Sequence, residues 1–112
     1  METIWSKKSD EILKIGLSLE EIGVRNWALN REQASIALDQ FEDEGIAILG
    51  GDVYEIQRES LRMNYDNWYC DRKKGESDGD FVHRSIAQAR KYIFSYGLSR
   101  DIECFFAIVP ES

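Results

Sequence analysis

The sequence has little proline, cysteine and histidine. One proline in 112 residues argues against a proline-rich linker, and 43% hydrophobic with 31% charged residues is ordinary for a folded protein. Two cysteines, Cys70 and Cys104, with the single histidine His83, are too few for the four ligands of a typical structural zinc site. The composition therefore predicts a single domain, residues 1–112, with no metal and no cofactor.

Long hydrophobic runs are also absent. The first eight residues lack the apolar segment of a signal peptide, and no stretch approaches transmembrane length. We therefore expect a cytoplasmic protein that does not bind membranes. In a reducing compartment, Cys70 and Cys104 are expected to be buried thiols rather than a disulfide.

Positive charge is scarce in one quarter of the chain. Between Glu32 and Glu59 there are eight acidic residues and one basic residue, Arg58, so this segment alone equals the net charge of −7. Such a segment repels nucleic acid and attracts a basic protein surface. The alternative interpretation is a solvated helix face that keeps the protein soluble.

Capping residues and apolar spacing predict three helices. The first is expected over residues 9–15 with Ser9 as N-cap, followed by a structured loop over residues 16–23. The second begins after Asn30, with Gln33 in capping-box position, and ends at Gly45. Its predicted buried stripe, at helical spacing, comprises Ala34, Ala37, Leu38 and Phe41.

The third helix is expected from about Phe81 to Tyr96, with Asp78 or Asp80 as its cap. Its predicted stripe comprises Val82, Ile86, Ala89, Ile93 and Tyr96.

Three strands complete the predicted fold. The first covers residues 46–56, with a bend or bulge at Gly50-Gly51, because only glycine enters positive φ without steric cost. The second covers residues 65–72, with Trp68 and Cys70 facing the core, and the third covers residues 102–109, ended by Pro110. Residues 57–61 are ambiguous. The order predicts an α+β fold with three or four antiparallel or mixed strands and about three helices.

The sequence contains no recognisable catalytic or nucleotide-binding motif. The glycine pair is not part of a phosphate-binding loop, since the residues after it are strand-like rather than helical. His83 has Asp80 and Glu76 nearby in sequence as partners for general acid or base catalysis, but a histidine in the first turn of a helix is more often a surface residue. Nothing in the cysteine spacing supports a nucleophilic pair with His83.

Several segments together resemble a known family. They are Ile48–Tyr54, which contains Gly-Gly-Asp-Val-Tyr, then Asn67-Trp68-Tyr69, Gly75-Glu76-Ser77, Ser85 with Ala89, Tyr92-Ile93 and the closing apolar strand. Over roughly residues 30–109 the chain resembles small bacterial immunity proteins that accompany polymorphic and contact-dependent growth-inhibition toxins.

This resemblance implies a non-enzymatic inhibitor without a cofactor. It would bind the carboxy-terminal domain of one cognate toxin in the cytoplasm, most simply as a monomer, and block its active site or substrate groove. Many such toxins are nucleases with basic grooves, which an acidic surface would fit. A regulatory or chaperone-like interaction module is the alternative, and a small enzyme is a further one. The expected partner-binding residues are Glu32, Asp39, Glu42, Asp43, Asp52 and Glu55, with Tyr54 as an aromatic anchor.

Overall fold

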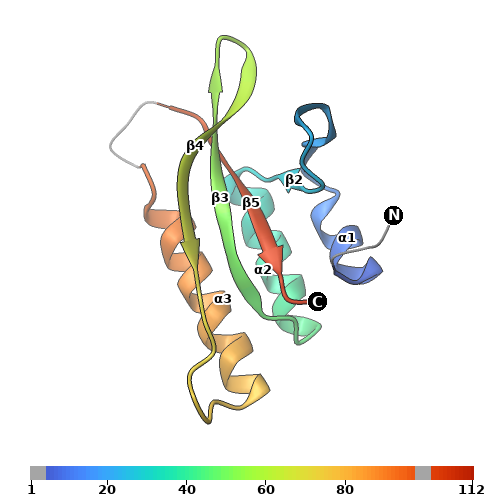
Figure 1. Cartoon of the computed structure of the whole chain (residues 1–112), viewed down its shortest axis with the longest axis vertical. Coiled ribbons are helices and arrows are strands. Elements are labelled where there is room, and N and C mark those ends of the chain that lie inside the picture. Colours follow the sequence, from blue (N-terminus) through green and yellow to red (C-terminus); the bar gives the residue numbers. More distant parts are fainter. Residues whose placement is uncertain (1–4, 98–101) are drawn as a thin grey trace.

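The computed structural model describes residues 5–97 and 102–112. Its centre is a three-stranded antiparallel sheet of order β4-β3-β5, formed by β3 (Ile48–Gln57), β4 (Ser60–Tyr69) and β5 (Cys104–Pro110). Two helices, α2 (Arg31–Asp43) and α3 (Asp78–Ser95), lie side by side against one face of this sheet (Figure 1). The predicted α+β fold is confirmed.

The amino-terminal segment adds α1 (Lys7–Leu13), β1 (Leu17–Ser18), the 3-10 turn η1 (Glu20–Ile22) and β2 (Trp27–Ala28). Strands β1 and β2 form a separate antiparallel pair, and Leu29 then exchanges two backbone hydrogen bonds with Phe106 of β5. The predicted N-cap of the first helix was wrong. Ser6 is the cap, and Ser9 lies buried inside the helix, where its backbone N–H donates to the Ser6 hydroxyl.

The second helix follows the sequence prediction closely. The Asn30 side chain accepts a hydrogen bond from the Gln33 backbone N–H at 2.8 Å, and the Gln33 side chain accepts one from the Asn30 N–H at 3.0 Å. This reciprocal capping box fixes the start of α2. The four predicted stripe residues have no exposed surface, because they pack against the sheet and the neighbouring helices.

The third helix also has its predicted buried stripe from Val82 to Ile93, whereas Tyr96, the last predicted member, is the half-buried C-cap of the helix. Its cap was predicted wrongly, since the hydroxyl of Ser77, and not Asp78 or Asp80, accepts a hydrogen bond from a backbone N–H of the first turn. Both aspartates follow the cap, where the positive end of the helix dipole favours their charge.

The glycine bend in β3 is confirmed. The register of β3 against β5 shifts between Ile48 and Gly50, and Gly50 has φ +155°. A Cβ atom at Gly50 would lie 2.2 Å from the carbonyl oxygen of Trp68, so the backbones of β3 and β4 approach too closely for any side chain. The buried ring of Trp68 itself stacks on Tyr92 of α3.

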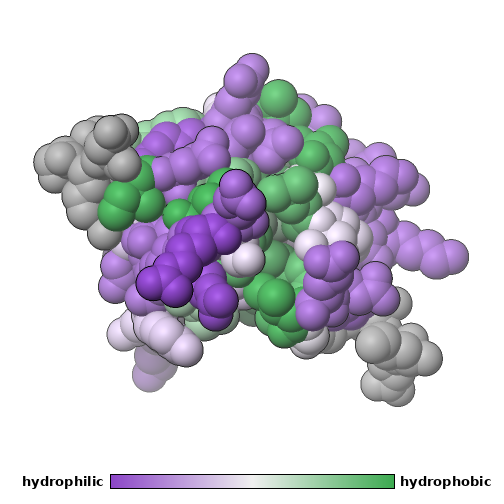
Figure 2. Space-filling model, turned by 90° about the horizontal axis from the view of Figure 1, so that it is seen from above, coloured by the Kyte–Doolittle hydropathy of each residue, from purple (hydrophilic) through white to green (hydrophobic). Residues whose placement is uncertain are grey.

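Strand β4 begins earlier than predicted, at Ser60 instead of Tyr65, and ends at Tyr69 instead of Arg72. It joins β3 through a tight turn at Arg58 and Glu59, both with positive φ. The ambiguous residues 57–61 thus form the tip of a hairpin. Figure 2 looks down on this end of the molecule and shows hydrophobic side chains interspersed with hydrophilic ones.

Candidate functional site

Two acidic residues of α2 are engaged with α3. Asp39 forms an ion pair with Arg90, while the Glu42 carboxylate lies 3.8 Å from the same guanidinium and 3.2 Å from Nδ1 of His83. These contacts join the exposed sides of the two helices. Asp39 and Glu42, both predicted to bind a partner, therefore have part of their negative charge offset within the fold.

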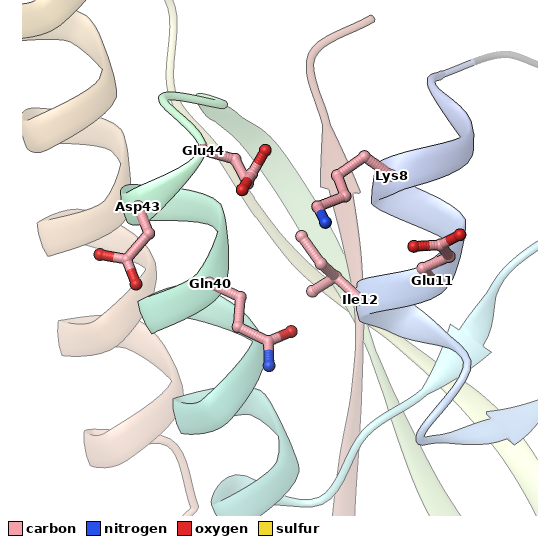
Figure 3. A pocket seen from close by; sticks show the side chains of 6 residues that line it. All are labelled: Lys8, Glu11, Ile12, Gln40, Asp43 and Glu44. Carbon is pink, nitrogen blue, oxygen red and sulfur yellow. The ribbon is translucent and has the colours of Figure 1, made fainter.

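Other acidic residues border a groove between α1 and α2. We call this the acidic groove; it encloses about 350 Å³ and is lined by Lys8, Glu11, Ile12, Gln40, Asp43 and Glu44. Figure 3 shows Lys8 and Glu44 reaching between the two helices, while Glu11 lies over α1 and the Asp43 carboxylate points to the side of α2 away from α1. Among the described residues, three carboxylates against one ammonium group give the groove a net negative charge. The sequence prediction included Asp43 but missed Glu11 and Glu44, because only the packing of α1 against α2 makes the groove.

The helix backbone adds to the negative potential of the acidic groove. The carboxyl end of a helix carries a partial negative charge equivalent to roughly half an elementary charge. Asp43 is the last residue of α2, Glu44 is its C-cap, and the last turn contains no basic residue. Within the described part of the chain neither carboxylate forms an ion pair. Negative charges at the negative end of a helix destabilise the free protein, and a positively charged group bound there would offset this repulsion.

The residues predicted on β3 lie in different environments. Tyr54 has no exposed surface and packs against Leu19 and Phe105, so it does not reach a partner as an anchor. Burial, with a smaller contribution from the Asp52 charge, raises the pKa of its hydroxyl. Glu55 is also buried and accepts a hydrogen bond from the Asn64 amide at 2.8 Å.

The last two predicted residues are accessible but separate from the acidic groove. Asp52 is half-buried on the face of the sheet opposite α2 and α3, since its neighbours Gly51 and Val53 face the helices. Glu32 is exposed in the first turn of α2, at the other end of that helix from Asp43. The predicted acidic set is thus divided among several parts of the surface and the interior.

The side chains considered for catalysis do not form a catalytic arrangement. His83 is exposed and pairs with Glu42, whereas Glu76 holds Arg84 at 2.7 Å and 2.8 Å. Arg84, bonded twice, lowers the pKa of Glu76 to about 2, which makes this carboxylate a poor general base. No group of three or more potential metal ligands occurs in the described ranges, and no helix there has the length and apolarity needed to cross a membrane.

Comparison with known families decides the relationship. Residues 18–110 match the protein family described as Immunity protein 40. The chain belongs to the Immunity protein 40 family. No match was found among curated proteins or among solved structures. The resemblance to immunity proteins is therefore confirmed, and it extends further toward the amino terminus than the motifs predicted.

The family match includes Asp52 and only part of the acidic groove. It covers the whole of α2 and the three-stranded sheet of this immunity protein, but it begins after α1. Lys8 and Glu11 of the acidic groove therefore lie outside the matched segment, whereas Asp43, Glu44 and Asp52 lie inside it. That the Gly-Gly-Asp-Val-Tyr segment marks the family stays a prediction.

Proposed function

We propose that this immunity protein neutralises a nuclease toxin by placing its acidic groove against the toxin's phosphate-binding surface. The family supports an inhibitor that neutralises a toxin. The observation that supports a nuclease is that Glu11, Asp43 and Glu44 line the groove at the negative end of α2, where Lys8 is the one cation among the described lining residues. A nuclease needs a basic groove to hold phosphates, and a rigid acidic surface is complementary to it.

The same charge distribution favours fast and selective association with a basic toxin. A concentrated negative field accelerates the encounter with a basic protein and repels the nucleic acid that competes for the same groove. A nuclease acting inside the producing cell has to be met in the cytoplasm, so we place the protein there. It acts there as a stoichiometric binding partner without chemistry of its own, in a contact-dependent or related polymorphic toxin system.

Co-expression tests this function. The carboxy-terminal domain encoded by the neighbouring open reading frame is produced in a sensitive host with and without this protein. We expect the wild-type protein to restore growth and to co-purify with that domain. The triple variant Glu11→Lys, Asp43→Lys, Glu44→Lys is expected to lose both properties.

The control is Glu59→Lys, a single charge reversal in the turn between β3 and β4. It is expected to protect as well as the wild type, because Glu59 does not line the acidic groove. Full protection by the folded triple variant would place the interface elsewhere. Absence of rescue by the wild-type protein would refute the proposed function itself.

A further inference from the structure

One face of the sheet is covered only in part. Helices α2 and α3 cover the first face, while on the opposite face Leu19 and Ala28 of the amino-terminal segment pack over Tyr54, Phe105 and Ala107. The part of β3 around the glycine pair is outside this second cluster. Here Leu49 is 38% exposed and Tyr69, on the neighbouring strand, is 71% exposed.

The glycine pair makes a hollow in this open part. We call it the Gly-Gly hollow; it encloses about 210 Å³, and its lining includes Leu49, Gly50, Asp52, Asn67 and Val109. Gly50 lies opposite Tyr69 on β4 and Val109 on β5, so a position without a side chain is flanked by two larger ones. No other residue fits at Gly50, since a Cβ atom there would meet backbone atoms of β4.

Of the described residues, Asp52 is the one charged residue that lines the Gly-Gly hollow. Asp52 lies opposite Asn67 on β4 and Ala107 on β5, and neither neighbour neutralises it. In the described ranges, its carboxylate forms no hydrogen bond and no ion pair. Burial alone raises the pKa of this carboxyl, which means that its charge is desolvated without compensation. The hollow therefore combines open volume with an uncompensated negative charge at its wall.

Its neighbours suit a planar cation. The Asn67 side chain already donates to the Tyr65 carbonyl at 3.3 Å, which leaves its amide oxygen available as an acceptor. Tyr69 offers an exposed aromatic face beside the same strand pair, where a guanidinium stacks favourably. A lysine ammonium would use the carboxylate only as a point charge, whereas arginine can use the carboxylate, the amide oxygen and the ring together.

We propose that the Gly-Gly hollow receives an arginine side chain of the cognate toxin, bound by Asp52 and Asn67 and stacked on Tyr69. The inference rests on the proposed function, because the occupant is part of the toxin. It assigns a role to the Gly-Gly-Asp motif, which is not part of the acidic groove. Charge complementarity identifies the occupant, since the charged group that the described residues contribute to the hollow is a carboxylate without an ion-pair partner among them.

The experiment is calorimetric titration of the purified toxin domain with Asp52→Asn, Tyr69→Ala and a control, Asp71→Asn. Asp71 is exposed just beyond β4 and does not line the hollow. Removing one member of a partly desolvated charge pair is expected to raise Kd by about 10- to 100-fold for Asp52→Asn. Asp71→Asn is expected to stay within about twofold of the wild type, as for a surface change outside an interface. Thermal unfolding of each variant shows that it is folded.

A double-mutant cycle identifies the arginine. Each arginine of the toxin domain is changed to alanine in turn. With one of these toxin variants, Asp52→Asn is expected to cause little further loss of affinity. Tight binding by the wild type with unchanged affinity for Asp52→Asn overturns this inference and leaves the proposed function standing. No binding by the wild type overturns both. A dimer of this chain that dissociates on Asp52→Asn would assign the hollow to a second copy and would also overturn the inference.

Discussion

Asp43→Lys is expected to change stability and toxin binding in opposite directions. Asp43 ends α2, at the negative pole of the helix, without a basic residue in that turn. An exposed charge at a helix end contributes about 0.3–1 kcal/mol, so replacing an unfavourable charge by a favourable one gains about 1 kcal/mol in total. Lysine also has the higher helix propensity of the two residues. The free energy of unfolding should therefore rise.

Affinity for the toxin should fall with the same substitution. Asp43 is one of the residues that line the acidic groove, so its carboxylate would be replaced by an ammonium group beside a basic surface, and like charges at an interface are strongly unfavourable. We expect Kd to rise by about tenfold or more, with the association rate most affected. Asp43→Asn should show a smaller change of the same sign in both quantities.

Urea unfolding followed by tryptophan fluorescence measures the first quantity, and surface plasmon resonance with the toxin domain measures the second. Glu59→Lys makes the same charge change in a turn, so it should leave both within experimental error. A more stable Asp43→Lys protein with wild-type affinity would exclude the acidic groove from the interface. A less stable protein would refute the helix-dipole argument itself.

Three further predictions concern the scaffold. Ser85→Ala should cost about 1–3 kcal/mol, measured by urea unfolding, because the Ile48 backbone N–H that donates to the buried Ser85 hydroxyl at 2.9 Å loses its acceptor; a cost near zero would contradict this. Gly50→Ala should cost about 2 kcal/mol or more because its Cβ meets immobile backbone, whereas Gly79→Ala, in open space within α3, should be neutral or stabilising; equal effects would be inconsistent with the close approach of β3 and β4. The stability difference between wild type and Glu76→Gln should be complete above about pH 4.5 and should disappear as the pH falls toward about 2. The reason is that Arg84 lowers the pKa of Glu76 in the folded state, so the unfolded chain binds the proton first as the pH falls. A stability difference independent of pH would contradict the ion pair.

Local signals predicted most of the helices and the bend in β3. The capping box at Asn30 and Gln33 acts within four residues, and the stripe of α2 requires only helical spacing, so both could be read directly. The β3–β4 hairpin was harder. Its turn residues Arg58 and Glu59 have positive φ, yet such turns normally contain asparagine or glycine. The pairing of Gln57 with Ser60 closes this turn against local preference, and the sequence therefore left it ambiguous.

The bulge in β4 was likewise beyond a local prediction. Three residues, Asn64, Tyr65 and Asp66, lie opposite the single Val53, and Tyr65 has φ +70°. The bulge is held by distant partners, since Tyr96 after α3 bonds both Asn64 and Asp66. Strict alternation along the strand, on which the prediction depended, cannot anticipate such contacts.

Charge patterning predicted that α2 is acidic but not which of its acids are available. Asp39 and Glu42 meet Arg90 and His83 only because α3 packs beside α2, although 41 to 51 residues separate the partners in sequence. Glu11 lines the acidic groove only because α1 packs against α2. The acidic residues predicted from their sequence positions to bind a partner are thus not the same as those that helix packing brings together in the acidic groove.

The salt dependence of toxin binding tests the central claim most directly. The affinity of the wild-type protein for the toxin domain should be measured by calorimetry at low and at physiological ionic strength. If uncompensated carboxylates of the acidic groove meet a basic surface, the affinity should fall steeply as salt increases, and it should fall less steeply for the triple groove variant. Binding that is equally tight at both salt concentrations would contradict an electrostatic inhibitor of a nuclease.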